Sequence, residues 1–195
     1  MDKIDFPQLP NFLIIGSGRC GTSFLYNCLQ QHPDIYLKES KKPEPHFFVK
    51  EKEYIKGLNY YSQSYFSSVS SESAIGEASV SYLYFERAAA KIKNDLGNIK
   101  FICMLRNPVD RIYSAYYNSY KTGWETLSFE DALAQEKNRF DNPPDEYHRD
   151  LQPRQYTMRG LYMKHIDIWL KYFPLKSFFF GIFEEMVRSP EEFIR

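Results

Sequence analysis

The sequence predicts an α/β fold in which helices flank a central parallel sheet. Short apolar runs alternate with segments of helical periodicity along the 195 residues, an order typical of strands that are covered on both faces. Two runs, Asn11–Ile15 and Ile99–Leu105, lead directly into segments that carry Gly, Arg and Ser. Ligands of open α/β sheets bind at the carboxyl ends of strands, so both junctions are candidate sites. Without an internal repeat or linker, we expect one domain over residues 1–195.

The first half of the chain contains three predicted strands. The run Asn11–Ile15 is followed by a glycine-bearing turn and by a helix over Thr22–Gln31, which ends before Pro33 because proline cannot continue the hydrogen-bond ladder. Ile35–Leu37 and Ala74–Glu77 are shorter strand candidates. Between them we expect a charged loop over Lys38–Pro45, a helical or irregular segment over Glu51–Tyr60, and a serine-rich surface loop over Ser62–Ser73.

The second half repeats the alternation of helix and strand. Tyr84–Leu96 is a predicted helix closed by Gly97, and the consecutive apolar residues of Ile99–Leu105 predict a buried strand. Pro108–Tyr120 is a predicted helix with proline at its start, and Ser128 is a candidate N-cap. Further on we expect a loop at Asn142–Pro144, a long helix over Tyr156–Tyr172 and a buried strand over Ser177–Phe183.

Composition limits the classes of function. Lys and Arg together number 25, as do Asp and Glu, so no net charge draws the chain to nucleic acid or to an anionic membrane. The three cysteines, Cys20, Cys28 and Cys103, favour a reducing compartment over a disulfide framework, and we expect no metal site because no CxxC pair occurs. No apolar run approaches the ~18 residues of a transmembrane helix. We expect a cytoplasmic protein, with a luminal catalytic domain as the alternative.

The segment from Gly16 to Ser23 predicts an anion-binding loop. Helix N-termini leave backbone N–H groups unpaired, and glycines let that backbone approach an anion closely. The spacing G-x-G-x-x-G fits a dinucleotide fingerprint, with Glu39 about 20 residues further on as the ribose-binding acid. It also fits a relative of the P-loop, although Thr22 stands where nucleoside-triphosphate enzymes have lysine and the cation is Arg19.

A second candidate anion site follows the strand Ile99–Leu105. Arg106 stands at the carboxyl end of the strand, and Ser114 comes eight residues later in the next helix. A guanidinium and a hydroxyl together suit a phosphate group. The alternative interpretation is that Arg106 pairs with Asp110 and that Ser114 is an ordinary helix-surface residue.

In these segments the chain resembles the 3′-phosphoadenosine 5′-phosphosulfate (PAPS)-dependent sulfotransferases, most closely the carbohydrate type related to the heparan sulfate enzymes and their bacterial relatives. Ile15–Ser23 resembles the family's 5′-phosphosulfate loop, and Arg106–Tyr116 resembles its 3′-phosphate motif. Glu44–Phe48 resembles the E-x-H-F-F segment that carries the catalytic acid of heparan-type members. Further similar stretches are Gly160–Tyr162, Trp169–Leu170, Phe173–Pro174 and Phe183–Glu185.

The resemblance implies a P-loop-like three-layer fold and an enzyme of the EC 2.8.2 type. Such an enzyme moves a sulfuryl group from PAPS to a hydroxyl or amine of a carbohydrate or small-molecule acceptor and leaves 3′-phosphoadenosine 5′-phosphate (PAP). Arg19 and Glu44 are the implied catalytic residues, and His46 is the alternative base. The implied cofactor-binding residues are Gly16, Ser17, Gly18, Arg19, Cys20, Gly21, Thr22, Ser23, Phe24, Arg106 and Ser114.

The chain also departs from the family pattern. Ala78 stands where heparan-type enzymes often have lysine, and the family's last cofactor loop normally lies beyond a point like Arg195. We therefore expect a single domain without the segment that closes over the cofactor. Lys41 and Lys42 are candidates for contacts with the acceptor or simply surface charges. Two other functions stay open: an NAD(P)-dependent oxidoreductase, and a nucleotide-binding module without activity.

Overall fold

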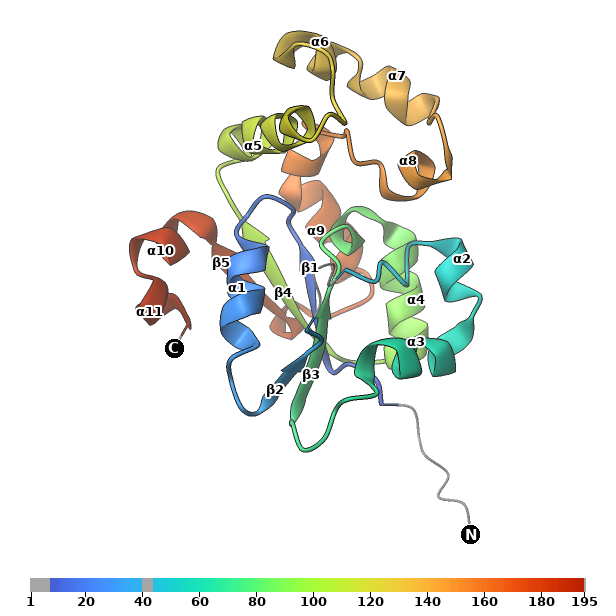
Figure 1. Cartoon of the computed structure of the whole chain (residues 1–195), viewed down its shortest axis with the longest axis vertical. Coiled ribbons are helices and arrows are strands. Elements are labelled where there is room, and N and C mark those ends of the chain that lie inside the picture. The colour runs from blue at the N-terminus through green and yellow to red at the C-terminus, as the bar shows by residue number, and fades with distance from the viewer. Residues whose placement is uncertain (1–7, 40–43, 195) are drawn as a thin grey trace.

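A five-stranded, wholly parallel sheet forms the centre of the computed structural model, which describes residues 8–39 and 44–194 (Figure 1). The order of its strands is β2-β3-β1-β4-β5, so β1 lies between β3 and β4. This sheet confirms the predicted α/β fold. The strands are β1 Phe12–Gly16, β2 Ile35–Leu37, β3 Ala74–Ala78, β4 Lys100–Leu105 and β5 Phe178–Ile182.

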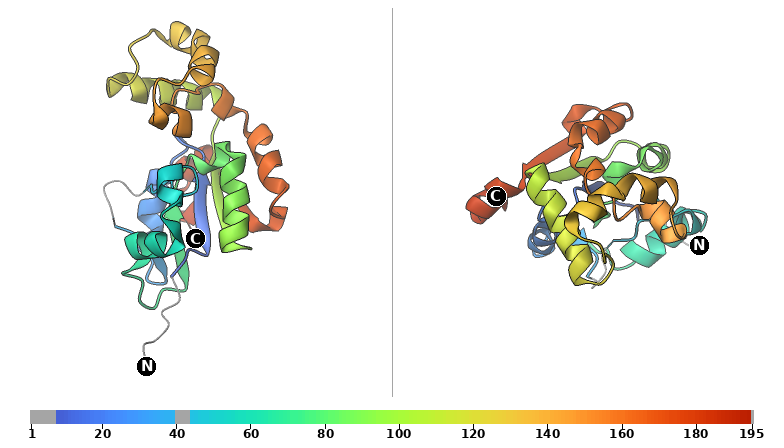
Figure 2. Two further views of the ribbon diagram at one scale, coloured as in Figure 1. Left: turned by 90° about the vertical axis from the view of Figure 1, so that its right-hand side faces the viewer. Right: turned by 90° about the horizontal axis from the view of Figure 1, so that it is seen from above.

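Helices cover both faces of the sheet, which explains why β1 is apolar at every position (Figure 2). Leu13 and Ile15 face the larger core, whereas Phe12 and Ile14 face the opposite side, because side chains alternate along a strand. One face packs against α1 Thr22–Leu29, α10 Phe183–Arg188 and α11 Pro190–Ile194. The other face packs against α4 Glu86–Leu96 and α9 Tyr162–Leu170.

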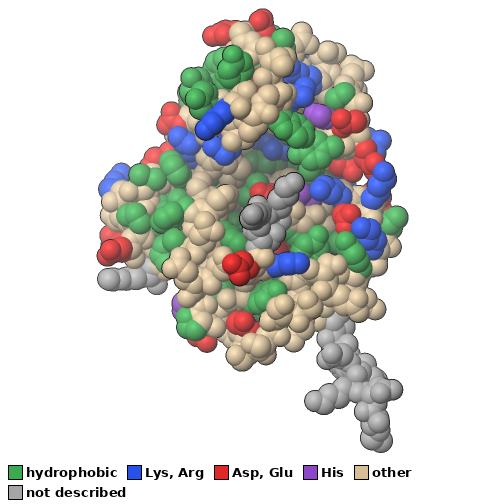
Figure 3. All heavy atoms as spheres, viewed as in Figure 1, with side chains coloured by type: hydrophobic (Ala, Val, Ile, Leu, Met, Phe, Trp, Pro, Cys, Tyr) green, Lys and Arg blue, Asp and Glu red, His purple; other side chains and the backbone are tan. Residues whose placement is uncertain are grey.

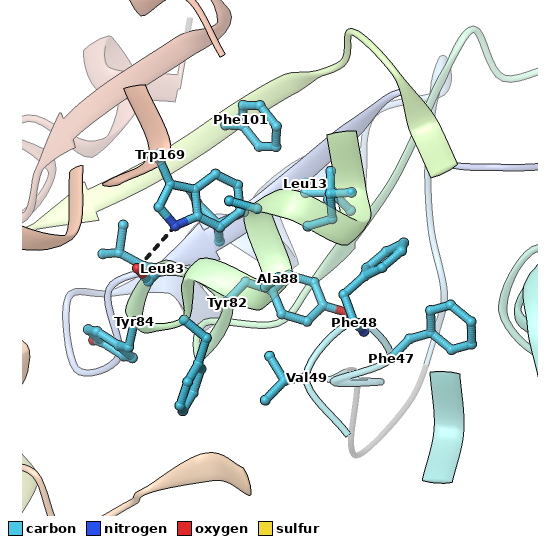
Figure 4. Packing of buried hydrophobic residues seen from close by; sticks show 14 of the residues in the cluster. Leu13, Phe47, Phe48, Val49, Tyr82, Leu83, Tyr84, Ala88, Phe101 and Trp169 are labelled. Atoms are coloured by element: carbon cyan, nitrogen blue, oxygen red, sulfur yellow. Dashed lines mark hydrogen bonds between the residues drawn. The ribbon is translucent and has the colours of Figure 1, made fainter. Parts of the chain in front are cut away.

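Aromatic side chains fill the larger core (Figure 4). The ring of Phe101 on β4 lies 5.2 Å from that of Trp169, 4.6 Å from that of Phe173 and 4.9 Å from that of Phe178. The indole N–H of Trp169 donates to the carbonyl of Leu83 at 3.1 Å, so even this fully buried ring has its polar group satisfied. These contacts hold α9 against β4 and β5.

A lobe of four helices lies beyond the carboxyl ends of the strands (Figures 1 and 2). It consists of α5 Pro108–Lys121, α6 Phe129–Ala134, α7 Glu136–Asp141 and α8 Glu146–Leu151. Glu125 is its buried centre: it accepts two hydrogen bonds from the guanidinium of Arg139, at 2.6 and 2.9 Å, and one from the hydroxyl of Tyr156 at 3.0 Å. In the described part of the chain, no helix is both long and apolar enough to cross a membrane.

Two predicted segments differ from the structure. The segment predicted as a surface loop over Ser62–Ser73 is helical at its beginning, where it forms the end of α3 Gly57–Phe66. The burial of Phe66 in the core stabilises this last turn of the helix. The helix predicted from Tyr156 begins only at Tyr162, since the backbone amides of Thr157 and Met158 donate to the carboxylate of Glu136, both at 2.9 Å. The remaining short elements are α2 Glu51–Tyr54 and the 3₁₀ turns η1 Tyr82–Tyr84, η2 Met158–Gly160 and η3 Leu175–Ser177.

Replacing the central carboxylate of the lobe tests how much this network stabilises the protein. We expect Glu125→Ala to lower the free energy of unfolding by about 3 kcal/mol, because it leaves the Arg139 guanidinium without its buried partner. Urea unfolding followed by circular dichroism measures the change. The matched control is Lys137→Ala, which removes a solvent-exposed ion pair with Asp141 and is expected to leave stability unchanged. Equal stability of the two variants would contradict the role of Glu125.

The same network predicts a pH dependence. Burial alone would raise the pKa of Glu125, but the hydrogen bonds from Arg139, Leu127 and Tyr156 outweigh it and lower the pKa to about 2. A carboxyl whose pKa falls on folding contributes stability above its unfolded pKa, here 4.5, and loses it as the pH falls towards 2. The difference between wild type and Glu125→Ala should therefore shrink over that interval of pH.

Candidate functional site

The two predicted anion motifs meet at the carboxyl ends of β1 and β4. The Nη1 of Arg106 donates to the carbonyl of Arg19 at 3.3 Å, and the Nε of Arg19 donates to the hydroxyl of Ser114 at 3.2 Å. Ser114 is half-buried and hydrogen-bonded, and the described ion pairs include none between Arg106 and Asp110. The alternative interpretation of this motif is therefore wrong, and Arg19, Arg106 and Ser114 form one cluster.

The loop before α1 presents free backbone donors. Gly21 is the N-cap of α1, with φ of 78°, and no side chain caps the helix. The amides of Thr22, Ser23 and Phe24, in the first turn, therefore have no partner within the helix. At Gly21 a Cβ would clash with Met186 and with Phe183, so only glycine fits both the left-handed conformation and the space.

Other residues of the loop hold its shape. The hydroxyls of Ser17 and Tyr84 share a hydrogen bond of 2.5 Å, and the amide of Gly18 donates to the same Tyr84 oxygen at 3.2 Å. Ser17 and Cys20 are fully buried, and burial raises the pKa of the Cys20 thiol. The sulfur of Cys20 also makes weak hydrogen bonds, to the carbonyl of Gly18 at 3.8 Å and with the hydroxyl of Tyr162 at 3.7 Å, so these buried residues help to fix the conformation of the loop.

The cluster is electropositive. Partial burial and then the positive charge of Arg106 lower the pKa of Arg19, because two guanidiniums lie close together. No described ion pair involves either of them. The guanidinium of Arg106 lies 4.5 Å from the ring of Phe183, and its buried Nε has no partner among the described residues. An anion bound here would relieve the repulsion and could satisfy the orphan donor.

The segment with the candidate bases is held against the residues that follow β3. The amide of Val80 donates to Glu44 Oε2 at 3.2 Å, and the amide of His46 donates to the hydroxyl of Ser79 at 2.9 Å. The Nδ1 of His46 is hydrogen-bonded to the hydroxyl of Ser81 at 2.8 Å. The Nε2 of His46 lies 3.5 Å from Glu44 Oε2. Three consecutive residues of one turn thus fix both candidates.

The environment shifts the pKa values of these two side chains in opposite directions. Burial raises the pKa of Glu44, although the Val80 amide and the positive charges of Arg159 and Lys50 oppose the shift. Burial and the same two charges lower the pKa of His46 to about 3. A carboxylate with a raised pKa takes up a proton more readily than usual, whereas this imidazole takes one up less readily.

Two charged residues of this region, Glu77 and Arg159, were not among the predicted site residues. Glu77 is buried at the end of β3 and accepts from the hydroxyls of Tyr61 at 3.0 Å and Ser79 at 2.9 Å; burial raises its pKa to about 7. A carboxylate at the carboxyl end of a predicted strand was the available signal. Arg159 packs on the ring of Tyr84 at 4.3 Å and donates to the carbonyl of Leu151. The sequence carried no signal for Arg159.

Other predicted residues lie as follows. The side chain of Phe24 is 47% exposed, so it is not a core residue and its ring is accessible to a ligand. Glu39 follows β2, which β3 separates from β1, whereas a dinucleotide fingerprint needs the acid on the strand next to the glycine loop. Lys41 and Lys42 lie outside the described residues.

Along most of its length the sequence is similar to known sulfotransferases. The family model described as "Sulfotransferase domain" matches residues 9–195. Heparan sulfate glucosamine 3-O-sulfotransferase 3B1 of Mus musculus is 32% identical over 183 residues, 94% of this chain and 43% of that protein. Membrane-associated sulfotransferase kil1 of Dictyostelium discoideum is 36% identical over 113 residues, 57% of this chain and 23% of that protein.

A solved structure is also similar. The sulfotransferase from Alicyclobacillus acidocaldarius is 33% identical and has a TM-score of 0.82, over 96% of this chain and 78% of that one. Its likeness confirms the expected P-loop-like three-layer fold. The chain spans less than half the length of the two curated relatives named above. The match along nearly all of the sequence, together with the shared fold, means that this chain belongs to the sulfotransferase family.

Proposed function

We propose that this chain transfers a sulfuryl group from PAPS to a hydroxyl or amine of a carbohydrate acceptor. One observation carries the proposal: Arg19 and Arg106, from two neighbouring strand ends, lie together without a carboxylate partner among the described residues. A relative with a similar sequence carries heparan sulfate glucosamine in its name, which supports a sugar as the acceptor.

The residues of the cluster fit the chemistry of PAPS, which carries an anionic group at each end of its adenosine. Arg106 and Ser114 would hold the 3′-phosphate through a guanidinium and a hydroxyl. Arg19 and the amides of Thr22 and Ser23 would hold the 5′-phosphosulfate at the N-terminus of α1. The buried Nε of Arg106, like those of Arg111, Arg154 and Arg159, has no partner among the described residues, and an anion bound at the cluster could satisfy it.

Two side chains would act on the reacting atoms. When bound, PAPS supplies an activated sulfuryl group. Glu44 would accept the proton of the acceptor hydroxyl or amine, and its raised pKa suits it to that task. Arg19 would stabilise the negative charge that develops on the 5′-phosphate oxygen of the leaving group. Positioning and charge stabilisation contribute most of the catalysis in transfers of this kind.

An oxidoreductase is disfavoured by topology, because Glu39 does not lie on the strand next to the glycine loop. A transfer assay distinguishes an active enzyme from a nucleotide-binding module without activity. Incubation with sulfur-labelled PAPS and a mixture of carbohydrate acceptors should label the acceptor. Tight binding of PAP without labelled product would instead indicate the inactive module.

Removing the cation of the first loop tests its catalytic role. We expect Arg19→Ala to reduce turnover at least about 100-fold, because a donor to the developing charge is lost. Sulfur-labelled PAPS and a fixed acceptor give the rate. Arg188→Ala, which removes an exposed arginine on α10, is the matched control and should leave turnover unchanged. Near-normal turnover in Arg19→Ala would refute this role.

The affinity for PAP tests the proposed role of Arg106 in binding the 3′-phosphate. We expect Arg106→Ala to weaken the affinity for PAP at least about tenfold, since a charge-assisted hydrogen bond contributes ~1.5–3 kcal/mol. Titration calorimetry with PAP measures this without any acceptor. Arg106→Lys keeps the charge but not the planar fork and should give an intermediate affinity. An unchanged affinity in the alanine variant would argue against a phosphate contact.

Two variants and the pH dependence of the transfer rate identify the catalytic base. Glu44→Gln should abolish transfer while PAP still binds, and His46→Ala should keep measurable transfer. Only the deprotonated carboxylate accepts a proton, so the wild-type rate should fall as the pH drops through the raised pKa of Glu44, above the ordinary 4.5. If His46→Ala is the inactive variant, the histidine is the base.

A further inference from the structure

Two exposed aromatic side chains of the helical lobe pack against each other. Trp124 lies between α5 and α6, and Tyr147 lies on α8; 48% and 42% of their surfaces are exposed. Their ring centroids are 5.3 Å apart with an interplanar angle of 49°. The ring of His148 lies 6.0 Å from that of Trp124 and supports the pair from the protein side. We call Trp124 and Tyr147 the aromatic shelf.

Contacts on either side of Tyr147 hold the shelf against the sheet domain. Glu146 forms an ion pair of 2.5 Å with Lys52 on α2. The guanidinium of Arg87 on α4 donates to the carbonyl of Asp150 at 2.8 Å. Figure 1 shows α8 above the sheet domain, with α2 and α4 below it. The position of the shelf is therefore set by the body that carries the proposed site.

One guanidinium joins the helix that carries Tyr147 to the glycine loop. Arg159 donates to the carbonyl of Leu151, at the end of α8, and packs on the ring of Tyr84 at 4.3 Å. The hydroxyl of Tyr84 is in turn hydrogen-bonded to Ser17 and Gly18 of the loop. Figure 3 shows hydrophobic side chains along the edge of the lobe that faces the sheet domain across a depression. The helix that carries Tyr147 thus adjoins the glycine loop of the donor cluster.

The chemistry of the shelf suits a sugar. One face of a pyranose ring carries C–H groups and is apolar, while its rim carries hydroxyls. Aromatic rings bury the apolar face, and the indole N–H and phenol O–H can bond to the rim. No hydrogen bond occupies either of these two polar groups among the described residues. Both side chains are uncharged at neutral pH, so they would recognise the ring rather than an anionic substituent.

We propose that Trp124 and Tyr147 form the acceptor subsite, on which a pyranose ring of the acceptor stacks. This inference rests on the proposed sulfuryl transfer and assigns the acceptor to the lobe, apart from the donor cluster of Arg19 and Arg106. The acceptor is therefore recognised mainly through the apolar face of a sugar ring.

Tryptophan fluorescence tests the subsite directly. The chain has two tryptophans, and Trp169 is fully buried, so a sugar-induced change of emission reports Trp124. We expect chitotetraose, a neutral pyranose oligomer, or a heparan sulfate tetrasaccharide to change the emission saturably, with and without PAP. Trp124→Phe should abolish the change. Tyr147→Ala should weaken the sugar at least about tenfold, as expected for loss of an aromatic contact.

Kinetics provides the second readout. Trp124→Ala and Tyr147→Ala should each raise the KM for the sugar acceptor while kcat and the calorimetric affinity for PAP stay unchanged. Phe179→Ala, which removes a similarly exposed aromatic residue from β5, is the matched control and should alter none of these values. A fall in PAP affinity together with a fall in melting temperature would mean that the residues are structural, and would overturn the assignment.

Two outcomes separate this proposal from the proposed function. If neither sugar changes the emission of Trp124 while PAP binds and labelled sulfate is transferred, the shelf is not the acceptor subsite. An aryl alcohol such as 4-nitrophenol that changes the emission where both sugars fail would also overturn it. If the sugars bind at the shelf but PAP does not bind at all, the shelf is a sugar-binding site, and the proposed sulfuryl transfer fails together with the role of the shelf as acceptor subsite.

Discussion

The parallel pairing of β1 with β3 on one side and with β4 on the other is the constraint on which the site depends. Because parallel strands end at the same edge, the residues that follow these three strands must lie together. The loop after β1 carries Arg19, the junction after β4 carries Arg106, and the turn after β3 holds Glu44. The packing of Phe101 on β4 against Trp169 on α9 helps to hold the strands that form this edge in place.

Burial of carboxyl groups at the same edge lowers the stability of the fold but shifts their pKa values. Glu77 is enclosed in the core, and such a carboxyl is tolerated only because its hydrogen bonds from Tyr61 and Ser79 offset the loss of water. Through the hydroxyl of Ser79 the same network reaches the backbone of His46, next to Glu44. The low polarity that makes this arrangement costly also raises the pKa of Glu44.

The proposed donor and acceptor sites lie in different parts of the protein. The donor cluster grows out of strand ends, where the backbone is held by the sheet and by the Tyr84 contact with the loop. The aromatic shelf belongs to a lobe that is joined to the sheet domain through side-chain contacts such as Lys52 with Glu146. Such a division would let one fold combine the same donor site with different acceptor sites, since function resides in sites carried by a common fold.

The residues alone determined the local features: the apolar run of β1, the strand β4, the glycine loop and the arginine at each strand end, because strand burial and loop chemistry are written in consecutive residues. They could not determine where α9 begins, since Glu136 captures the amides of Thr157 and Met158 from 21 and 22 positions away. The burial of Glu77, the place of Arg159 and the contact of Tyr147 with Trp124 were likewise decided by tertiary structure. Each depends on partners distant in sequence, whose solvent exclusion and charge no local pattern encodes.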